Sequence, residues 1–388
     1  MNKERIPALD GVRGIAILLV MVHHYAQLLN PANTIDRLVL GAARAGWVGV
    51  DLFFVLSGFL ITGILYDTRN ARNYFPSFYA RRFLRIFPLY YAALVFFFVV
   101  LPLLSADALG PTASRWPWFW LHLSNFLIVW QGFPSRYVQH FWSLAIEEQF
   151  YLVWPLVVVW LPRRSLTAMS AGIIVAAAAL RGVIDRHGVG AVTNYVHTLT
   201  RADALAMGAA LALLLRDPVE TRRVRRTAPW ILAVALPAAV FLLTRTSSRP
   251  AWLSWGLREQ ILGYSFIGIA FTAAIAWSVT RPAGSLMNRT LACGPLRFLG
   301  RYSYGIYVIH LPLDTLARSL DLHVDAIARR VGAITPSLLI YLVFAGATSV
   351  ALAVLSWNVL EKRFLSMKRH FEPLFSEGHS PSLDVPSL

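Results

Sequence analysis

Residues 9–25 read LDGVRGIAILLVMVHHY. The apolar run within them continues to Leu29 and approaches the roughly 20 residues that an α-helix needs to cross a bilayer. Lys3 and Arg5 precede the run as they would in a signal peptide, but Arg13 and two adjacent histidines interrupt it. No clear small-x-small cleavage site follows. We therefore expect a first membrane helix that is retained.

The whole chain shares this apolar character. Of its 388 residues, 57% are hydrophobic and only 14% are charged, whereas typical soluble domains carry about 25% charged residues. The composition excludes an ordinary soluble enzyme and a disordered chain, and the single cysteine, Cys293, excludes an intrachain disulfide and a cysteine metal cluster. We predict an all-α polytopic membrane protein with about ten transmembrane helices in one bundle. The predicted spans are residues 12–29, 46–66, 88–104, 140–161, 167–184, 202–215, 229–243, 260–279, 299–316 and 336–357.

Two stretches fall outside these spans. The run from Trp116 to Trp130 is short and rich in tryptophan, so we expect it to be interfacial or re-entrant. The last residues, 371–388, are rich in serine and proline and are expected to form a disordered cytoplasmic tail after a membrane domain at residues 1–370.

The net charge of +16 is explained by orientation in the membrane. With ten spans and a cytoplasmic N-terminus, most of the 36 lysines and arginines fall on the cytoplasmic side. Both termini are therefore predicted to be cytoplasmic. The basic excess does not require a nucleic-acid partner.

Ionisable groups inside a span cost about 3 kcal/mol or more, and each is a functional hypothesis. Arg13 and His24 are eleven residues apart, which places them within about 20° of each other on one helix face, near Asp10. The alternative is a buried histidine that bonds a neighbouring helix. His23 is rotated by about 100° from His24 and is the weaker candidate.

The segment HFWSLAIEEQFYLVWP carries a second polar stripe. His140, Ser143, Glu147 and Tyr151 share one helix face, whereas Glu148 lies about 100° away. Glu147 is therefore the preferred interior carboxylate. The alternative is a structural ion pair or a hydrogen bond between helices.

Two further spans carry polar faces. Ser303, Tyr307, His310 and Asp314 form a stripe that could also simply pack the bundle. Asp51, near the outer end of its span, is expected either to position a hydroxyl substrate or to cap the helix.

The juxtamembrane segment FYARRFLRIFPLYY places Arg82 and Arg85 on the cytoplasmic side, where they suit the phosphates of a nucleotide-like donor. The alternative is orientation plus contact with lipid headgroups. The sequence has no P-loop, HExxH or GxSxG motif, and no histidine pair has good zinc spacing with a third ligand, so no metal is expected.

Taken together, these motifs resemble the bacterial acyltransferase family 3, integral-membrane O-acyltransferases that modify glycans and related acceptors. The family's Arg-ten residues-His pattern matches Arg13 and His24, and its double-arginine pattern matches Arg82 and Arg85. Its Trp-Ser-Leu and Glu-Glu patterns match Trp142, Ser143, Glu147 and Glu148. Matching stretches run in the family's order at residues 9–25, 46–63, 78–91, 141–156, 201–212, 299–313 and 357–364.

The resemblance implies a multi-pass protein of the bacterial inner membrane. It implies acyl-CoA, usually acetyl-CoA, as a cytoplasmic co-substrate, with no tightly bound cofactor. The expected acceptor is a cell-surface glycan or a lipid-linked sugar, and the length suggests a stand-alone member without the extracytoplasmic SGNH-type domain of longer relatives.

These expectations give a mechanism. A sugar hydroxyl needs a base, for which His24 is expected, with Glu147 orienting it or balancing its positive charge and Arg13 contacting CoA or the carboxylates. Arg82 and Arg85 would hold CoA phosphates. Substrate binding is expected at four residues: Asp51, Ser143, Tyr307 and His310.

Three alternatives remain open at this point. His24 could itself carry the acyl group as an acyl-histidine. Membrane-embedded His, Glu and Arg groups also occur in proton-coupled transporters and flippases. A sensor or scaffold could hold the same polar networks for structure alone.

Overall fold

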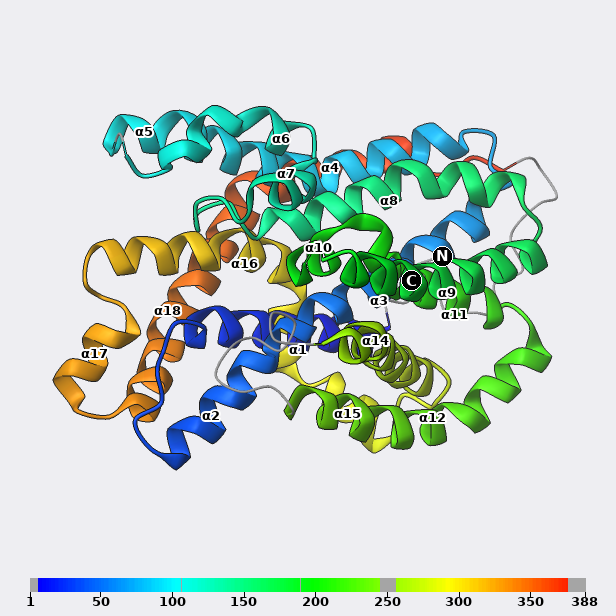
Figure 1. Ribbon diagram of the computed structural model, residues 1–388. Coiled ribbons are helices and arrows are strands. Elements are labelled where there is room, and N and C mark those ends of the chain that lie inside the picture. The colour runs from blue at the N-terminus through cyan, green and yellow to red at the C-terminus, as the bar shows by residue number, and fades with distance from the viewer. Residues whose placement is uncertain (1–5, 106, 189, 245–255, 376–388) are drawn as a thin grey trace.

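The computed structural model describes residues 6–105, 107–188, 190–244 and 256–375 (Figure 1). Across these ranges the regular structure is helical, with no β-strand. The α-helices are α1 (Pro7–Ala26), α2 (Thr34–Arg44), α3 (Gly49–Thr68), α4 (Tyr74–Val95), α5 (Leu101–Leu104), α6 (Trp116–Trp120), α7 (Ser124–Gln131), α8 (Phe141–Trp160), α9 (Arg163–Arg186), α10 (Ala191–Val196), α11 (Thr198–Leu214), α12 (Pro218–Thr244), α14 (Leu257–Val279), α15 (Leu286–Leu291), α16 (Gly294–Ser319), α17 (Val324–Val331), α18 (Ile334–Ser356) and α19 (Lys362–Ser366).

Seven helical segments in the described part of the chain are long and apolar enough to cross a membrane. A helix lies at each of the ten predicted ranges, but α8, α11 and α16 do not meet that standard, so a count of about ten is not confirmed. Helix α11 has only 17 residues. Helices α8 and α16 carry the two polar stripes, which lower their apolar content.

The tryptophan-rich run from Trp116 to Trp130 forms two short helices, α6 and α7. His122, between them, has a φ of 53°, a left-handed conformation that a continuous α-helix does not accommodate. Neither piece approaches the length of a membrane span.

The start of the predicted tail is bound to the rest of the protein. Asn73 and Ser77, at the start of α4, hydrogen-bond the backbone of Phe371, Glu372 and Leu374. The expected disorder of the remaining tail concerns residues 376–388, which lie outside the described residues.

Glycines set the distances between the central helices. A Cβ on Gly300 of α16 would overlap the Asp10 carbonyl of α1, and one on Gly14 of α1 would overlap the Leu296 carbonyl. Helices α3 and α11 meet in the same way through Gly58 and Gly208. Small residues of this kind let membrane helices approach to backbone contact.

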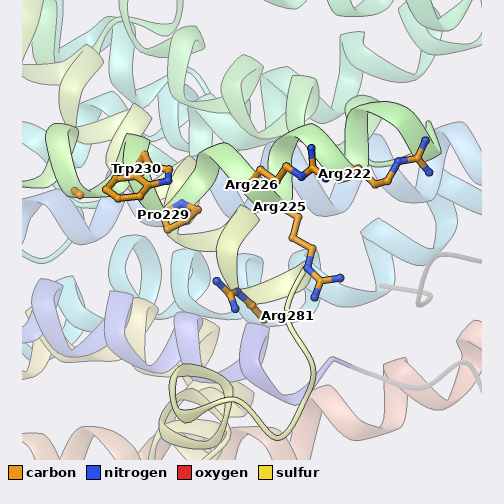
Figure 2. A pocket seen from close by; sticks show the side chains of 7 residues that line it. Arg222, Arg225, Arg226, Pro229, Trp230 and Arg281 are labelled. Atoms are coloured by element: carbon orange, nitrogen blue, oxygen red, sulfur yellow. The ribbon is translucent and has the colours of Figure 1, made fainter.

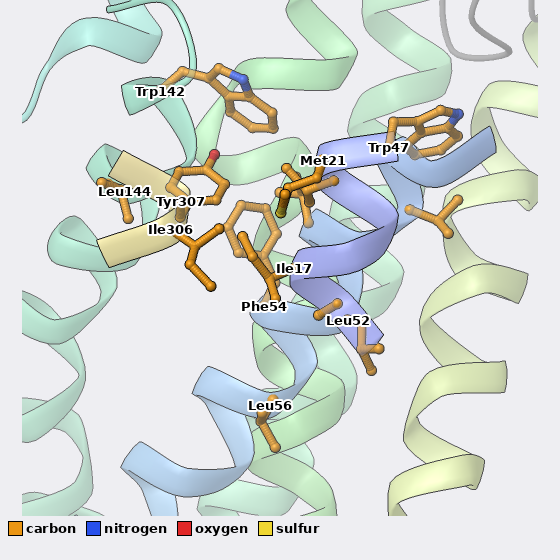
Figure 3. Close-up of a cluster of buried hydrophobic side chains, with 14 of the residues drawn as sticks. Ile17, Met21, Trp47, Leu52, Phe54, Leu56, Trp142, Leu144, Ile306 and Tyr307 are labelled. Carbon is orange, nitrogen blue, oxygen red and sulfur yellow. The ribbon is translucent and has the colours of Figure 1, made fainter. Parts of the chain in front are cut away.

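Apolar side chains fill the space around these contacts. Figure 3 shows Ile17 of α1, Phe54 of α3 and Ile306 of α16 gathered in one buried cluster. Interhelix packing therefore fixes the relative positions of α1, α3 and α16, the helices that carry much of the candidate site.

The glycine contact between α3 and α11 is testable by adding one methyl group. Gly58→Ala would force the methyl into the Leu205 carbonyl, and we expect the free energy of unfolding to fall by ~1–3 kcal/mol. Thermal unfolding in detergent measures the change.

Gly172→Ala in α9 is the matched control, because no atom lies within 4 Å of its added Cβ. This variant should be as stable as the parent or slightly more stable, since alanine favours helix over glycine. Equal stability of both variants would show that α3 and α11 can move apart at no cost.

Candidate functional site

A cavity of about 120 Å³ lies among α1, α3, α4, α8 and α16. Six of the nine predicted site residues line it: Arg13, Arg82, Arg85, Ser143, Glu147 and Tyr307. Asp51, His24 and His310 do not. The structure thus brings most of the predicted residues to one place from four separate helices.

Arginines form one side of this cavity. The Arg82 guanidinium lies 4.6 Å from the ring centre of Tyr151, and that of Arg85 lies 5.4 Å from the ring centre of Trp357. Arg13 pairs with Asp10 one turn earlier on α1, at 3.3 Å. Aromatic faces hold Arg82 and Arg85 in place and leave their N–H groups able to bind an anion.

Carboxylates face the arginines. Glu147 accepts a hydrogen bond from Ser57, and the Ser57 hydroxyl in turn accepts one from Tyr151 at 3.0 Å. Glu148 lines the same cavity, although the helical stripe placed it on another face. Arg82 interacts electrostatically with both carboxylates, which moderates the cost of burying two acids side by side.

Hydroxyl groups line the side of the cavity nearer the start of α8. The oxygens of Ser143 and Tyr307 lie 2.5 Å apart, which joins α8 to α16. The Tyr307 hydroxyl also donates to the backbone carbonyl of His140 at 2.9 Å. The His140 ring then lies 5.7 Å, between centroids, from that of His310.

His24 and His310 form a hydrogen-bonded pair beyond these hydroxyls. His24 Nδ1 lies 2.8 Å from His310 Nε2. His310 Nδ1 lies 2.8 Å from the Tyr307 carbonyl and 3.0 Å from that of Ile306. Carbonyl oxygens only accept, so His310 carries its proton on Nδ1.

This bonding assigns the tautomers of the neutral pair. Because His310 Nδ1 holds the proton, its Nε2 accepts, and His24 must donate from Nδ1. The lone pair of His24 is then on Nε2. Two backbone carbonyls thus orient His310, and His310 orients His24 with a basic nitrogen pointing away from the pair.

The predicted contact between Glu147 and His24 is not observed in the structure. The hydrogen-bond partner of His24 is His310, and Glu147 bonds Ser57. The residue that lies beside His310 is His140, immediately before α8, and Glu147 is seven residues, about 10 Å, further along the chain in that helix.

The position of His24 along α1 also differs from the predicted one. Helix α1 begins at Pro7 and ends at Ala26, so His24 lies in its last turn and not in the middle of a span. Arg13 and His24 are about 16 Å apart along the axis, so α1 presents one group to the cavity and the other to the histidine pair.

The structure places Asp51 in an ion pair. Its carboxylate pairs with Arg201 of α11 at 2.5 Å, and both side chains are buried. It therefore neither lines the cavity nor acts as a helix cap. Arg201 was not selected from the sequence, because nothing in the local pattern links it to a residue 150 positions earlier.

The structure also places in this region polar residues that were not among the predicted site residues. Ser57, Glu148 and Tyr151 line the cavity. Asp314, one turn after His310, binds Arg136 at 2.8 Å and Tyr341 at 2.9 Å. A depth-ordered set of polar groups therefore runs from the arginines through the carboxylates and hydroxyls to the histidines.

In the described part of the chain, no group of three His, Cys, Asp or Glu side chains converges as metal ligands do. The chemical resources of the region are anion-binding guanidinium groups, carboxylates, hydroxyls and an oriented imidazole.

Comparison with known proteins places this geometry in a family. A family model described as an acyltransferase domain matches residues 6–357, a range that contains every residue of the candidate site. No solved structure matches the chain.

Curated relatives match over most of this chain. The "Peptidoglycan O-acetyltransferase OatA" of Listeria monocytogenes is 30% identical over 336 residues, 81% of this chain and 50% of the relative. The "Putative peptidoglycan O-acetyltransferase YrhL" of Bacillus subtilis is 32% identical over 330 residues, 80% and 49% respectively. The "O-acetyltransferase OatA" of Staphylococcus aureus is 29% identical over 338 residues, 81% and 51%. The chain thus spans about half the length of these relatives.

The buried pair beneath the site yields a stability test. Arg201→Met leaves Asp51 buried without its partner, and we expect the free energy of unfolding to fall by ~3–5 kcal/mol. Denaturant unfolding in detergent measures the loss.

The double variant Asp51→Leu/Arg201→Met should recover part of that stability, because it leaves no unpaired charge. A single variant as stable as the parent would mean that the pair is not needed to hold α3 against α11.

Proposed function

The chain belongs to the acyltransferase 3 family, and we propose that it is a membrane O-acetyltransferase that transfers an acetyl group from acyl-CoA to a hydroxyl of a cell-wall glycan. The relatives' names, which specify O-acetyltransferase and in two cases peptidoglycan, support the reaction and the acceptor class. The observation that carries the proposal is the His24–His310 hydrogen bond, which leaves His24 Nε2 as a base.

His24 acts as the general base. A sugar hydroxyl is a weak nucleophile near neutral pH, and removal of its proton as it attacks makes the step feasible. The hydroxyl oxygen forms a bond to the thioester carbonyl carbon, the carbon–sulfur bond breaks, and the proton taken by Nε2 passes to the leaving thiolate. His310 is a positioning residue that fixes the tautomer of His24.

The arginine side of the cavity holds the donor. Arg13, Arg82 and Arg85 offer N–H groups that match the phosphates of CoA. The cavity, about 120 Å³, is small, so it suits an acyl group, while the nucleotide part of the donor stays at its mouth.

The groups between the two ends bind the reacting atoms. Ser143 and Tyr307 lie between the arginines and the histidines and contact the acyl group on its way to the acceptor. Glu147 has a revised role: it orders Ser57 and balances the positive charge of the arginines.

Orientation follows from the charges. The basic segments favour cytoplasmic termini in the bacterial inner membrane, so the donor enters from the cytoplasm at Arg82 and Arg85 and the acceptor from the opposite side at His24. The rival functions, a transporter or flippase, would not consume acetyl-CoA.

Removing the base provides the first test. His24→Ala should lower the rate of acetyl transfer from acetyl-CoA to a soluble glycan acceptor by about 100- to 10,000-fold, the usual contribution of general-base catalysis. The assay is free CoA release by purified protein in detergent.

His23→Asn is the matched control. His23 binds the Arg44 carbonyl at 2.7 Å through Nδ1, and an asparagine amide can make the same bond. This variant should keep most activity. Near-normal transfer by folded His24→Ala would exclude His24 as either base or acyl carrier.

The donor site is tested separately. Arg82→Gln/Arg85→Gln should raise the KM for acetyl-CoA at least tenfold with a smaller effect on kcat, since each charge-assisted hydrogen bond is worth ~1.5–3 kcal/mol. Steady-state kinetics with varied acetyl-CoA measures both constants. An unchanged KM would place CoA elsewhere.

A further inference from the structure

A second, larger cavity lies away from the candidate site. It has a volume of about 800 Å³ and is lined by α12 and by the segment that follows α14. Figure 2 shows three arginines along α12, with Arg281 on the opposite wall. None of its lining residues belongs to the first cavity, and the proposed reaction makes no use of it.

The walls of this cavity are strongly positive. Arg222, Arg225, Arg226 and Arg281 line it, and no carboxylate does. The nearest acids in the sequence are already engaged: Asp217 pairs with Arg163 at 2.6 Å, and Glu220 pairs with Arg223 at 2.7 Å.

None of the four arginines forms an ion pair within the described residues. Four guanidinium groups around one space repel one another, and an anion between them would offset that repulsion. Guanidinium forks match phosphate oxygens in particular, so the cavity suits a phosphate-bearing ligand.

The rest of the cavity wall is apolar and leads onto a bare helix face. Arg226, Trp230 and Val234 follow one another at four-residue intervals, so they share one face of α12. Trp230 is 73% exposed and Val234 is 69% exposed. Helix α12 is long and apolar enough to cross a membrane, where Trp230 and Val234 would face lipid with the tryptophan at the interface, the depth that tryptophan favours.

Along this face the arginines come first and apolar side chains follow, which matches the charged headgroup and apolar chains of a phospholipid. We propose that the cavity binds the phosphate headgroup of an anionic phospholipid between Arg225 and Arg281, with its acyl chains along the apolar face beyond Trp230. A soluble phosphate compound would use the arginines but would leave the apolar face unexplained. Basic pockets at the cytoplasmic ends of membrane helices bind anionic headgroups in this manner.

Native mass spectrometry of the full chain in detergent tests the proposal. The probes are phosphatidylglycerol and phosphatidylcholine with identical acyl chains, and ADP as a soluble phosphate. We expect retained phosphatidylglycerol, little phosphatidylcholine and no comparable binding of ADP. Arg225→Gln/Arg281→Gln should weaken phosphatidylglycerol binding at least tenfold, about 1.4 kcal/mol.

Arg223→Gln/Arg289→Gln is the matched control. It removes one charge from α12 and one from α15, the helix that follows the segment of Arg281, both outside the cavity, and it should bind phosphatidylglycerol as the parent does. If the main double variant does not fold, the exposed position Arg281→Gln alone tests the same site and should shift binding in the same direction.

Three results would overturn the proposal. Equal loss in the two double variants would show a general charge effect. Equal retention of phosphatidylcholine would remove the role of the phosphate charge. Binding of ADP with no preference for phosphatidylglycerol would assign the cavity to a soluble phosphate compound.

Discussion

The backbone contact between α1 and α16 is the constraint on which the candidate site depends. Gly14 and Gly300 allow the two helices to touch. Arg13 and His24 project from one of them, and Tyr307 and His310 from the other. A larger residue at either glycine would separate the helices, and a separation of even 1 Å would break a 2.8 Å bond between two imidazoles. The hydrogen bond between His24 and His310 therefore depends on glycine at positions 14 and 300.

Buried charge serves two purposes in the same bundle. Asp51 and Asp203 each form a buried ion pair with an arginine, Arg201 and Arg181 respectively, away from the cavity. The groups around the cavity are different, since Glu147 takes its hydrogen bond from a serine and the arginines rest on aromatic rings. The Asp51–Arg201 pair joins α3 to α11 and the Arg181–Asp203 pair joins α9 to α11, whereas the groups around the cavity remain able to bind a ligand.

The sequence predicts which residues share a face of one helix, but it does not predict the contacts between residues of different helices. Helical periodicity placed Arg13 with His24, and Ser143 with Glu147, because angular position along a helix follows from spacing alone. It could not find His310 as the partner of His24, or Arg201 as the partner of Asp51, since those residues are 286 and 150 positions apart and meet only through packing. The ends of helices were also uncertain: α1 ends at Ala26 and not at Leu29, where the apolar run ends, and this earlier end places His24 in the last turn. The count of about ten spans is not confirmed, because α11 has only 17 residues and α8 and α16 carry polar stripes, so these three helices do not qualify by length and composition.

The hydrogen bonds between the start of α4 and residues 371–374 determine when this part of the protein can be completed during synthesis. Asn73 and Ser77 find their partners about 300 residues later in the chain, and α4 is the helix that carries Arg82 and Arg85. During synthesis this end of α4 is made before residues 371–374, so its hydrogen-bond partners are absent until almost the whole chain has been made. The arginine end of the cavity is thus among the last parts of the protein to be completed, because the contact that anchors α4 forms only after residues 371–374 have been made.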